Sequence, residues 1–337
     1  MNRMPLGPRI APRVAPRVAM VLGDPAGIGP EIAARLLSDP ANLAKAEVLL
    51  VADRAEVLDG ARIAGVTLPL AEGNTPAAGR LTLRHVPGDA PFERKRATAN
   101  GGAHALKTLR ECLDLAQSGA ADAVCFAPLN KSSLHAAGMG HNDELHWFAE
   151  VLGYSGPTSE FNVCDGLWTC RVTSHIALKD VAAQITVPNV VGAIRLIHDA
   201  LTRAGKATPR IAVCGLNPHN GDNGAFGREE IEVIGPAISE AHRQGLPAEG
   251  PYPADTIFLR AKEVDAIVTM YHDQGQIAMK LMGFWRGITV AGGVPVPITT
   301  CAHGSGFDIQ GQGVAKVGAL QAAFDLACEM GSRRAQG

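Results

Sequence analysis

VAMVLGDPAGIGPE, residues 18–31, is the stretch that decides the fold. Its first five residues are apolar, which is typical of a buried strand. The glycines that follow permit a tight turn, and Pro30 marks the start of a helix. The stretch therefore predicts a strand, a glycine turn and a helix. The turn is either structural or holds an anion at the helix N-terminus, and the two readings stay open.

The same alternation of strand and helix continues along the chain. Further buried strands are expected at 47–52, 81–86, 122–127, 169–173, 210–214, 265–270 and 287–291. Helical patterns are expected at 30–37, 99–118, 187–204, 229–244 and 316–330. This order predicts a layered α/β architecture, and 337 residues are enough for two domains with sizeable cores.

The bulk composition argues against several classes of protein. A net charge of −2 is unlike that of a protein with a large nucleic-acid surface. No apolar run approaches the ~20 residues that span a bilayer. The seven cysteines include no Cys-x-x-Cys pair, and several lie in apolar runs. We therefore expect buried free thiols, a cytoplasmic location, and neither nucleic acid nor membrane as a partner.

The first 17 residues differ from the rest of the chain. They carry four arginines and several prolines but no acidic residue. They lack the apolar stretch of a secretory signal, and their prolines oppose the amphipathic helix of a transit peptide. We therefore expect residues 1–17 to form a disordered or extended N-terminal tail.

Three histidines share one local setting. His175, His219 and His272 each follow an apolar, β-branched run and open a polar turn. In α/β proteins such positions lie at the carboxyl ends of strands, where ligands bind. Three imidazoles that leave open coordination positions suit a catalytic divalent metal, although a hydrogen-bonded structural role is the alternative for each ring. Asp222 and Asp273 either orient these rings or cap the helices that follow.

Two lysines and one glycine-rich segment complete the candidates. Lys131 and Lys280 lie in apolar contexts, which suits proton transfer or the binding of an anionic substrate, and surface lysines are the alternative. Residues 302–315 contain four glycines ahead of the last helix. This segment indicates either a loop that receives a flat or phosphate-bearing ligand, or only a long turn.

These motifs together resemble the PdxA family, the 4-hydroxythreonine-4-phosphate dehydrogenases of vitamin B6 synthesis and their paralogues. The matching stretches are GDPAGIGPE, APLNK, CGLNPHNG, PADT and YHDQG, in that order. The segment that begins at His303 also resembles the adenosine-binding loop of isopropylmalate dehydrogenases. The likeness extends from about residue 18 to the last helix.

The resemblance implies an isocitrate/isopropylmalate dehydrogenase-like fold of two α/β/α domains with a cleft between them. A cofactor-side domain would comprise 18–134 with 290–337, and residues 135–289 would form the metal, substrate and dimerisation domain. It also implies a homodimer with shared active sites. One divalent ion (zinc, cobalt, manganese or magnesium) would be bound by His175, His219 and His272, drawn from both subunits.

The resemblance further implies an NAD or NADP dehydrogenase. It would oxidise a secondary alcohol β to a carboxylate of a small hydroxy acid, with decarboxylation. Substrate contacts carry over to Lys280, and to Asp255 and Asp273, and Lys280 or Asp273 would shuttle protons. The cofactor would lie along a run of five residues: His303, Gly304, Ser305, Asp308 and Ile309.

Departures from the family pattern bear on the substrate. Where many members carry Gly-His-Thr-Glu, a gapless reading places Asp-Glu-Leu-His at 143–146, with His141 nearby. An Asn and an Arg that help to hold the phosphorylated substrate become Thr289 and Ile298, which removes a bidentate phosphate partner. Glu144 and His141 favour a substrate with hydroxyls or a cationic group, unless the segment is simply a helix start. We therefore expect a paralogue with a different hydroxy-acid substrate.

Three other functions are compatible with these residues. A terephthalate-type cis-dihydrodiol dehydrogenase would use the same metal and cofactor on a cyclic acid. A non-redox metal lyase or hydrolase would bind no nucleotide, and an α/β ligand-binding module would bind small acids without turnover. The appearance of NADH separates the redox functions from the other two.

Overall fold

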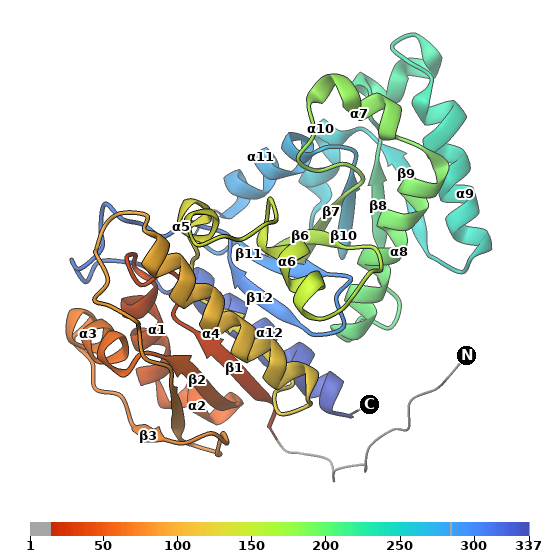
Figure 1. The fold of residues 1–337 in the computed structure, drawn as a ribbon. Helices are drawn as coiled ribbons and strands as arrows, with labels where there is room; N and C mark the ends of the chain where they lie inside the picture. Colours follow the sequence, from red (N-terminus) through yellow and green to blue (C-terminus); the bar gives the residue numbers. More distant parts are fainter. Residues whose placement is uncertain (1–14, 284, 337) are drawn as a thin grey trace.

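Twelve strands form one continuous sheet in the computed structural model, which describes residues 15–283 and 285–336. Their order is β3-β4-β2-β1-β5-β12-β11-β6-β7-β10-β8-β9, and helices cover both faces (Figure 1). The α/β prediction is confirmed. Residues 1–14 of the predicted tail lie outside the described residues, and Arg17 already begins the first strand.

All eight predicted strands are present, with ends within two residues of the predicted ones. The strands are β1 (Arg17–Val21), β2 (Glu47–Ala52), β3 (Leu70–Glu72), β4 (Leu81–His85), β5 (Ala123–Phe126), β6 (Ser159–Cys164), β7 (Leu167–Arg171), β8 (Ile211–Cys214), β9 (Ala248–Tyr252), β10 (Ala266–Thr269), β11 (Ile288–Gly292) and β12 (Ile298–Cys301). Strands β3, β6, β9 and β12 were not predicted.

The predicted helices are also present, and several shorter ones were missed. The helices are α1 (Gly29–Ser38), α2 (Pro40–Lys45), α3 (Arg54–Ala64), α4 (Ala99–Gln117), α5 (Lys131–Ala136), α6 (Glu144–Val151), α7 (Leu178–Gln184), α8 (Val187–Arg203), α9 (Gly235–Arg243), α10 (Ala254–Ile257), α11 (His272–Gly283) and α12 (Gly318–Gln336). The expected helix at 229–244 is a π-turn, Glu230–Ile234, followed by α9. Asp39, Asp53, Asn130 and Asp143 cap four of the missed helices.

The centre of the sheet differs from its two ends. The strands from β3 to β12 are parallel to one another, and so are β7, β10, β8 and β9. Between these groups, β11 is antiparallel to β12 and β6, and β6 is antiparallel to β7. The blue strands β11 and β12 therefore join the two halves (Figure 1). The predicted domain boundary between 289 and 290 falls inside β11, and the division into two domains stays a prediction.

One face of the sheet carries a core that runs through both halves. Met20, Phe161, Ile194, Val268 and Phe324 belong to this single cluster, under α1, α8, α9 and α12. On the other face, one cluster lies under α4 and α6 and a separate one under α10 and α11. Between these two clusters, residues of the central strands β6, β11 and β12 line adjoining cavities, which together form a cleft with these strands as its floor.

Two composition-based predictions concern the whole chain. The seven cysteines are free and buried, as predicted. Of the described helices, none is by itself long and apolar enough to cross a membrane. Helices α7 and α8, which are bent by 93° relative to each other, meet the length and composition criterion only as a pair.

Candidate active site

Polar side chains line the floor of the cleft because successive side chains of the central strands point to opposite faces of the sheet. In β11, Ile288 and Val290 are buried, whereas Thr289 and Ala291 are half-buried. Thr289 pairs in register with Thr300 of β12 and with Asn162 of β6. Two cavities of about 350 and 170 Å³ adjoin here, and both are lined by Thr289.

Two of the three predicted metal-binding histidines lie side by side. His272 is the first residue of α11, and His175 follows β7, so the ends of neighbouring strands bring them together. Their ring centroids are 5.6 Å apart. Nδ1 of His272 is hydrogen-bonded to Oδ1 of Asp273 at 2.7 Å, which leaves Nε2 for a metal ion. Burial lowers the pKa of His175, which favours the neutral imidazole that a metal requires.

His219 is placed differently from the other two. It lies on the turn after β8, in the left-handed backbone region at φ 53°, and is exposed. No ring contact joins it to His175 or His272 within residues 15–283 and 285–336. In the same ranges, no group of three or more His, Cys, Asp or Glu side chains is arranged to hold a metal. The three-histidine site therefore stays a prediction.

Helix α11 presents a second candidate to the cleft. His272, Gln276 and Lys280 are four residues apart, so they share one face, and all three line the smaller cavity. Lys280 thus lines the same cavity as His272, one member of the histidine pair. Asp273 faces solvent, with a side chain 71% exposed, and Asp255 is exposed on α10. Neither acid lines the two cavities.

The larger cavity collects the predicted substrate-binding residues. Glu144, Thr289 and Ile298 line it together with Lys131, whose ammonium is 4.0 Å from a carboxylate oxygen of Glu144. Burial raises the pKa of Glu144, and Lys131 only partly opposes the effect. His141, in contrast, pairs with Glu150 at 2.5 Å and faces a neighbouring cavity.

Two roles were expected for the segment 140–147: selection of the substrate, or simply the start of a helix. Each role fits a different residue. Asp143 is the N-cap of α6, because its Oδ1 accepts the backbone N–H of His146 at 2.9 Å. The helix-start alternative therefore holds for Asp143. Glu144, in the first turn, lines the cavity wall instead.

Glu144→Gln is expected to raise the melting temperature at pH 7–8 by about 1–3 °C. The pKa of Glu144 is raised in the folded state, so its ionised form costs the fold free energy. The gain should fade as the pH falls below the ordinary glutamate pKa, where folded and unfolded chains are both protonated. Thermal melts across this pH range measure it. Glu150→Gln, at the exposed end of the same helix, should give no gain at any pH, and an equal gain there would contradict the argument.

Sequence reasoning missed three polar residues of the cleft floor. Arg171 of β7 is buried and donates to Oε2 of Glu160 at 2.7 Å and to Oδ1 of Asn162 at 3.0 Å. Asn162 also donates to Oγ1 of Thr289 at 3.4 Å and accepts from the side chain of Gln276. The signal that could have revealed Glu160 and Asn162 is the alternation in SEFNVC, residues 159–164, where these two residues flank an apolar one.

The two glycine-rich motifs pack against each other. The N–H of Ile28 donates to the carbonyl of Ser305 at 2.9 Å, and the whole turn 23–29 is buried. Asp24 accepts from the N–H of Ala26 and from Oγ of Ser133, which supports the structural reading of this turn. The backbone hydrogen bond between Ile28 and Ser305 therefore holds the turn and the C-terminal loop against each other.

The C-terminal loop offers features that suit a nucleotide. His303 and Gly304 line the larger cavity, and the space beside Gly304 is open. Oγ of Ser305 is buried and has no hydrogen-bond partner within the described residues. Asp308 is exposed and Ile309 is half-buried against the core. The loop therefore fits the predicted cofactor, whose binding stays a prediction.

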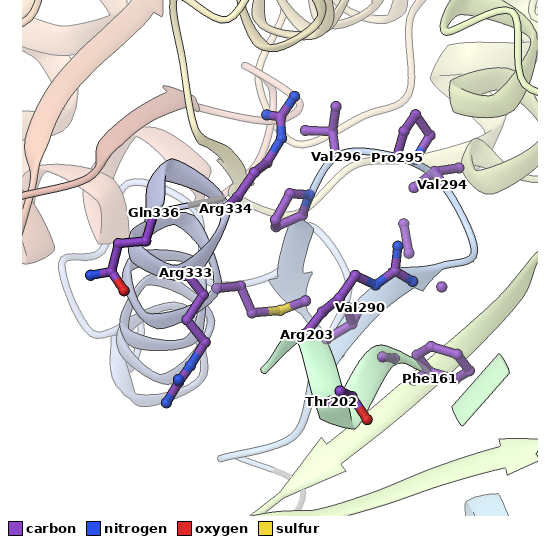
Figure 2. Close-up of a pocket in the computed structure, with 15 residues that line it drawn as sticks. Phe161, Thr202, Arg203, Val290, Val294, Pro295, Val296, Arg333, Arg334 and Gln336 are labelled. Atoms are coloured by element: carbon purple, nitrogen blue, oxygen red, sulfur yellow. The ribbon is translucent and has the colours of Figure 1, made fainter. Parts of the chain in front are cut away.

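A separate cavity of about 600 Å³ lies away from these residues (Figure 2). Arg203 from α8 and Val290 from the buried side of β11 line it, as does the C-terminal end of α12. Arg334 donates to the carbonyls of Ala116 and Ala121, at the end of α4 and just after it. None of the predicted site residues lines this cavity.

The match to known proteins covers nearly the whole chain. Residues 38–327 match the family described as "Pyridoxal phosphate biosynthetic protein PdxA". A Pseudomonas aeruginosa protein named "Putative 4-hydroxythreonine-4-phosphate dehydrogenase 2" is 58% identical, over 94% of this chain and 97% of its own. The D-threonate 4-phosphate dehydrogenase of Cupriavidus necator is 37% identical, over 94% of this chain and 97% of its own. The crystal structure of 4-hydroxythreonine-4-phosphate dehydrogenase from Klebsiella pneumoniae has a TM-score of 0.83 and 32% identity, covering 95% of this chain and 99% of that one.

Proposed function

The chain belongs to the PdxA family, and from this premise we propose that it is a metal-dependent NAD(P) dehydrogenase acting on a small hydroxy acid. The reaction would oxidise a secondary alcohol β to a carboxylate, with loss of carbon dioxide. The observation that carries the proposal is the pair of imidazoles, 5.6 Å apart, beside the α11 face that carries Lys280. The dehydrogenase names of the similar proteins support the same reaction type.

His175 and His272 would hold the divalent ion with His219 of a second copy of the chain. Adjacent imidazoles, one of them with Nδ1 already engaged, suit that role. When bound, such an ion supplies Lewis-acid polarisation of the substrate oxygen. A homodimer with shared active sites follows from this assignment, because His219 makes no contact with the other two rings within the described chain.

The remaining residues of the cleft would bind substrate and move protons. Lys280 would hold or transfer the proton of the reacting hydroxyl, since it shares the smaller cavity with His272. Gln276 and Thr289 would donate hydrogen bonds to substrate oxygens. The nicotinamide cofactor would lie along 303–309, with Ser305 Oγ as a buried polar partner.

Substrate identity is where this chain would differ from its relatives. The similar proteins are named for 4-hydroxythreonine 4-phosphate and D-threonate 4-phosphate, which are both hydroxy acids with a phosphate. Here Ile298, Thr289 and Glu144 line the larger cavity and supply no guanidinium for a phosphate. We therefore expect a paralogue that prefers a hydroxy acid other than these two phosphorylated ones.

Incubation with NAD or NADP and a panel of hydroxy acids should produce absorbance at the reduced nicotinamide band. For 4-phosphohydroxythreonine, kcat/KM should stay below the ~10⁴ M⁻¹s⁻¹ low end of ordinary enzymes, because the phosphate partners are missing. Turnover above that value would contradict the substrate argument. Reduction of the nicotinamide only in the presence of cyclic diol acids would indicate a dihydrodiol dehydrogenase instead. Metal-dependent turnover of an acid without nucleotide reduction would indicate a lyase or hydrolase.

A further inference from the structure

Glu160 occupies the junction of the cavities in the cleft. It lies on β6, in register with Ala291 of β11, and its side chain faces the cleft rather than the core. It lines the larger cavity with Glu144 and also the neighbouring cavity that contains His175. Its charge acts on both of these residues: it raises the pKa of Glu144 and partly offsets the lowering of the pKa of His175.

Arg171, on the neighbouring strand β7, fixes the position of Glu160. Its Nη2 donates to Oε2 of Glu160 at 2.7 Å, its Nη1 to Asn162 at 3.0 Å and its Nε to Oγ of Ser174 at 3.0 Å. The guanidinium thus bonds through all three nitrogens and its side chain is only 5% exposed. It lines the neighbouring cavity but not the larger one. Gln276 links Asn162 to the helix face of His272 and Lys280.

The carboxylate keeps one acceptor oxygen for a ligand. Oε1 of Glu160 has no hydrogen-bond partner among the described residues, and the side chain is 22% exposed. An ionised carboxylate only accepts hydrogen bonds, so a hydroxyl is a suitable partner. The acids Glu144 and Glu160 face one ammonium, that of Lys131, and no arginine is among the residues found to line the larger cavity. A phosphate dianion would meet like charge there with no bidentate partner.

We propose that Glu160 is a specificity-determining residue that binds the end of the substrate lying in the larger cavity. It selects an end that carries free hydroxyl groups over the same end bearing a phosphate. The preferred substrate class is therefore an unphosphorylated polyhydroxy acid. This inference rests on the proposed function for the reacting end of the substrate.

The test compares matched substrates in the full-length protein. D-Threonate and 4-hydroxythreonine are each assayed beside their 4-phosphates, with the wild type and three variants. The wild type should favour the unphosphorylated acid in kcat/KM by more than about 10-fold. Glu160→Gln should lower that ratio by about 10-fold to 100-fold, chiefly through KM, because it loses a charged hydrogen bond and its repulsion of phosphate.

Two further variants separate recognition from structure. Glu160→Asp keeps the charge and should retain most of the preference. Asp165→Asn is the matched control, because Asp165 also pairs with an arginine, Arg286, at 2.7 Å but is exposed and lines none of the three cleft cavities. It should leave the ratio unchanged. Metal content should be equal in all variants, and a loss in Glu160→Gln alone would make Glu160 a metal ligand and overturn the assignment.

Titration calorimetry with the same acids separates this inference from the proposed function. If no acid reduces the nicotinamide but binding shows the preference and Glu160→Gln loses it, the proposed function fails and the inference stands. If turnover is found and the wild type favours the phosphorylated acids, or if Glu160→Gln leaves the ratio unchanged, the inference fails and the proposed function stands. Absence of binding by every acid counts against both.

Discussion

His272→Ala is expected to abolish metal retention and to lower kcat/KM by more than about 10³-fold. His272 and His175 are the two imidazoles that the fold brings together, at 5.6 Å between ring centroids. Removing one of two or three nitrogen ligands leaves too few to hold a catalytic ion against dialysis. Metal per chain is measured by plasma mass spectrometry after dialysis, and activity by nicotinamide reduction.

His175→Ala and His219→Ala should have the same effect, the latter although His219 lies apart within one chain. His198→Ala is the control, because His198 lies on α8, its ring is hydrogen-bonded to Asp199 at 3.1 Å, and it is not among the residues found to line the cleft cavities. It should keep both metal and activity. Circular dichroism should be unchanged in all four variants. A triple variant of the cleft histidines that keeps its full metal content would show that the site lies elsewhere.

Lys280→Met should lower kcat by about 10²-fold to 10⁴-fold, the range expected when a positioned proton-transfer group is removed. Lys280 shares a face of α11 with His272 and Gln276, and all three line the smaller cavity. Metal content should be unaffected, because the lysine is not a ligand. Rates are measured at saturating substrate across pH 6–10, so that a change in kcat is distinguished from a change in KM.

Lys280→Arg distinguishes the two roles that a lysine can have at this place. Arginine keeps the charge but does not release a proton in this pH range. If Lys280 transfers a proton, kcat stays low in the arginine variant; if it only holds an anionic group, most of the activity returns. Lys262→Met, an exposed lysine outside the cleft cavities, is the control. A decrease of less than about 3-fold in Lys280→Met would remove Lys280 from the mechanism.

The sequence predicted strands such as β1 and β5, which are buried on both faces, and missed β6, which is not. Strands such as β1 and β5 have helices on both sides, so they read as continuous apolar runs. Strand β6 has one face in the core and one in the cleft, so Glu160 and Asn162 interrupt its apolar residues. Such a run is easily read as a loop when no neighbouring strand is known.

The residues of the candidate site were likewise predicted only in part. The shared setting of the three histidines predicted one site; the structure brings His175 and His272 together, and no ring contact among the described residues joins His219 to them. The departures at Glu144, Thr289 and Ile298 proved to line a single cavity. Strands β6 and β7, which join Glu160 to Arg171, form a hairpin across Asp165 and Gly166, a local signal that was missed. The place of this hairpin in the sheet, between β11 and β10, is set by contacts between distant segments.

Strands β11 and β12 are made last on the ribosome, yet they lie in the middle of the sheet, between β5 and β6. Until they emerge, any half-sheets that form from the earlier strands would each have an open edge of unpaired backbone groups, on β5 and on β6. Such edges are sites for pairing with other chains, so a chaperone that shields them would aid synthesis. We expect the sheet to close only when the β11–β12 hairpin inserts between the halves, before α12 packs against it. The cleft floor around Thr289 forms in that same step.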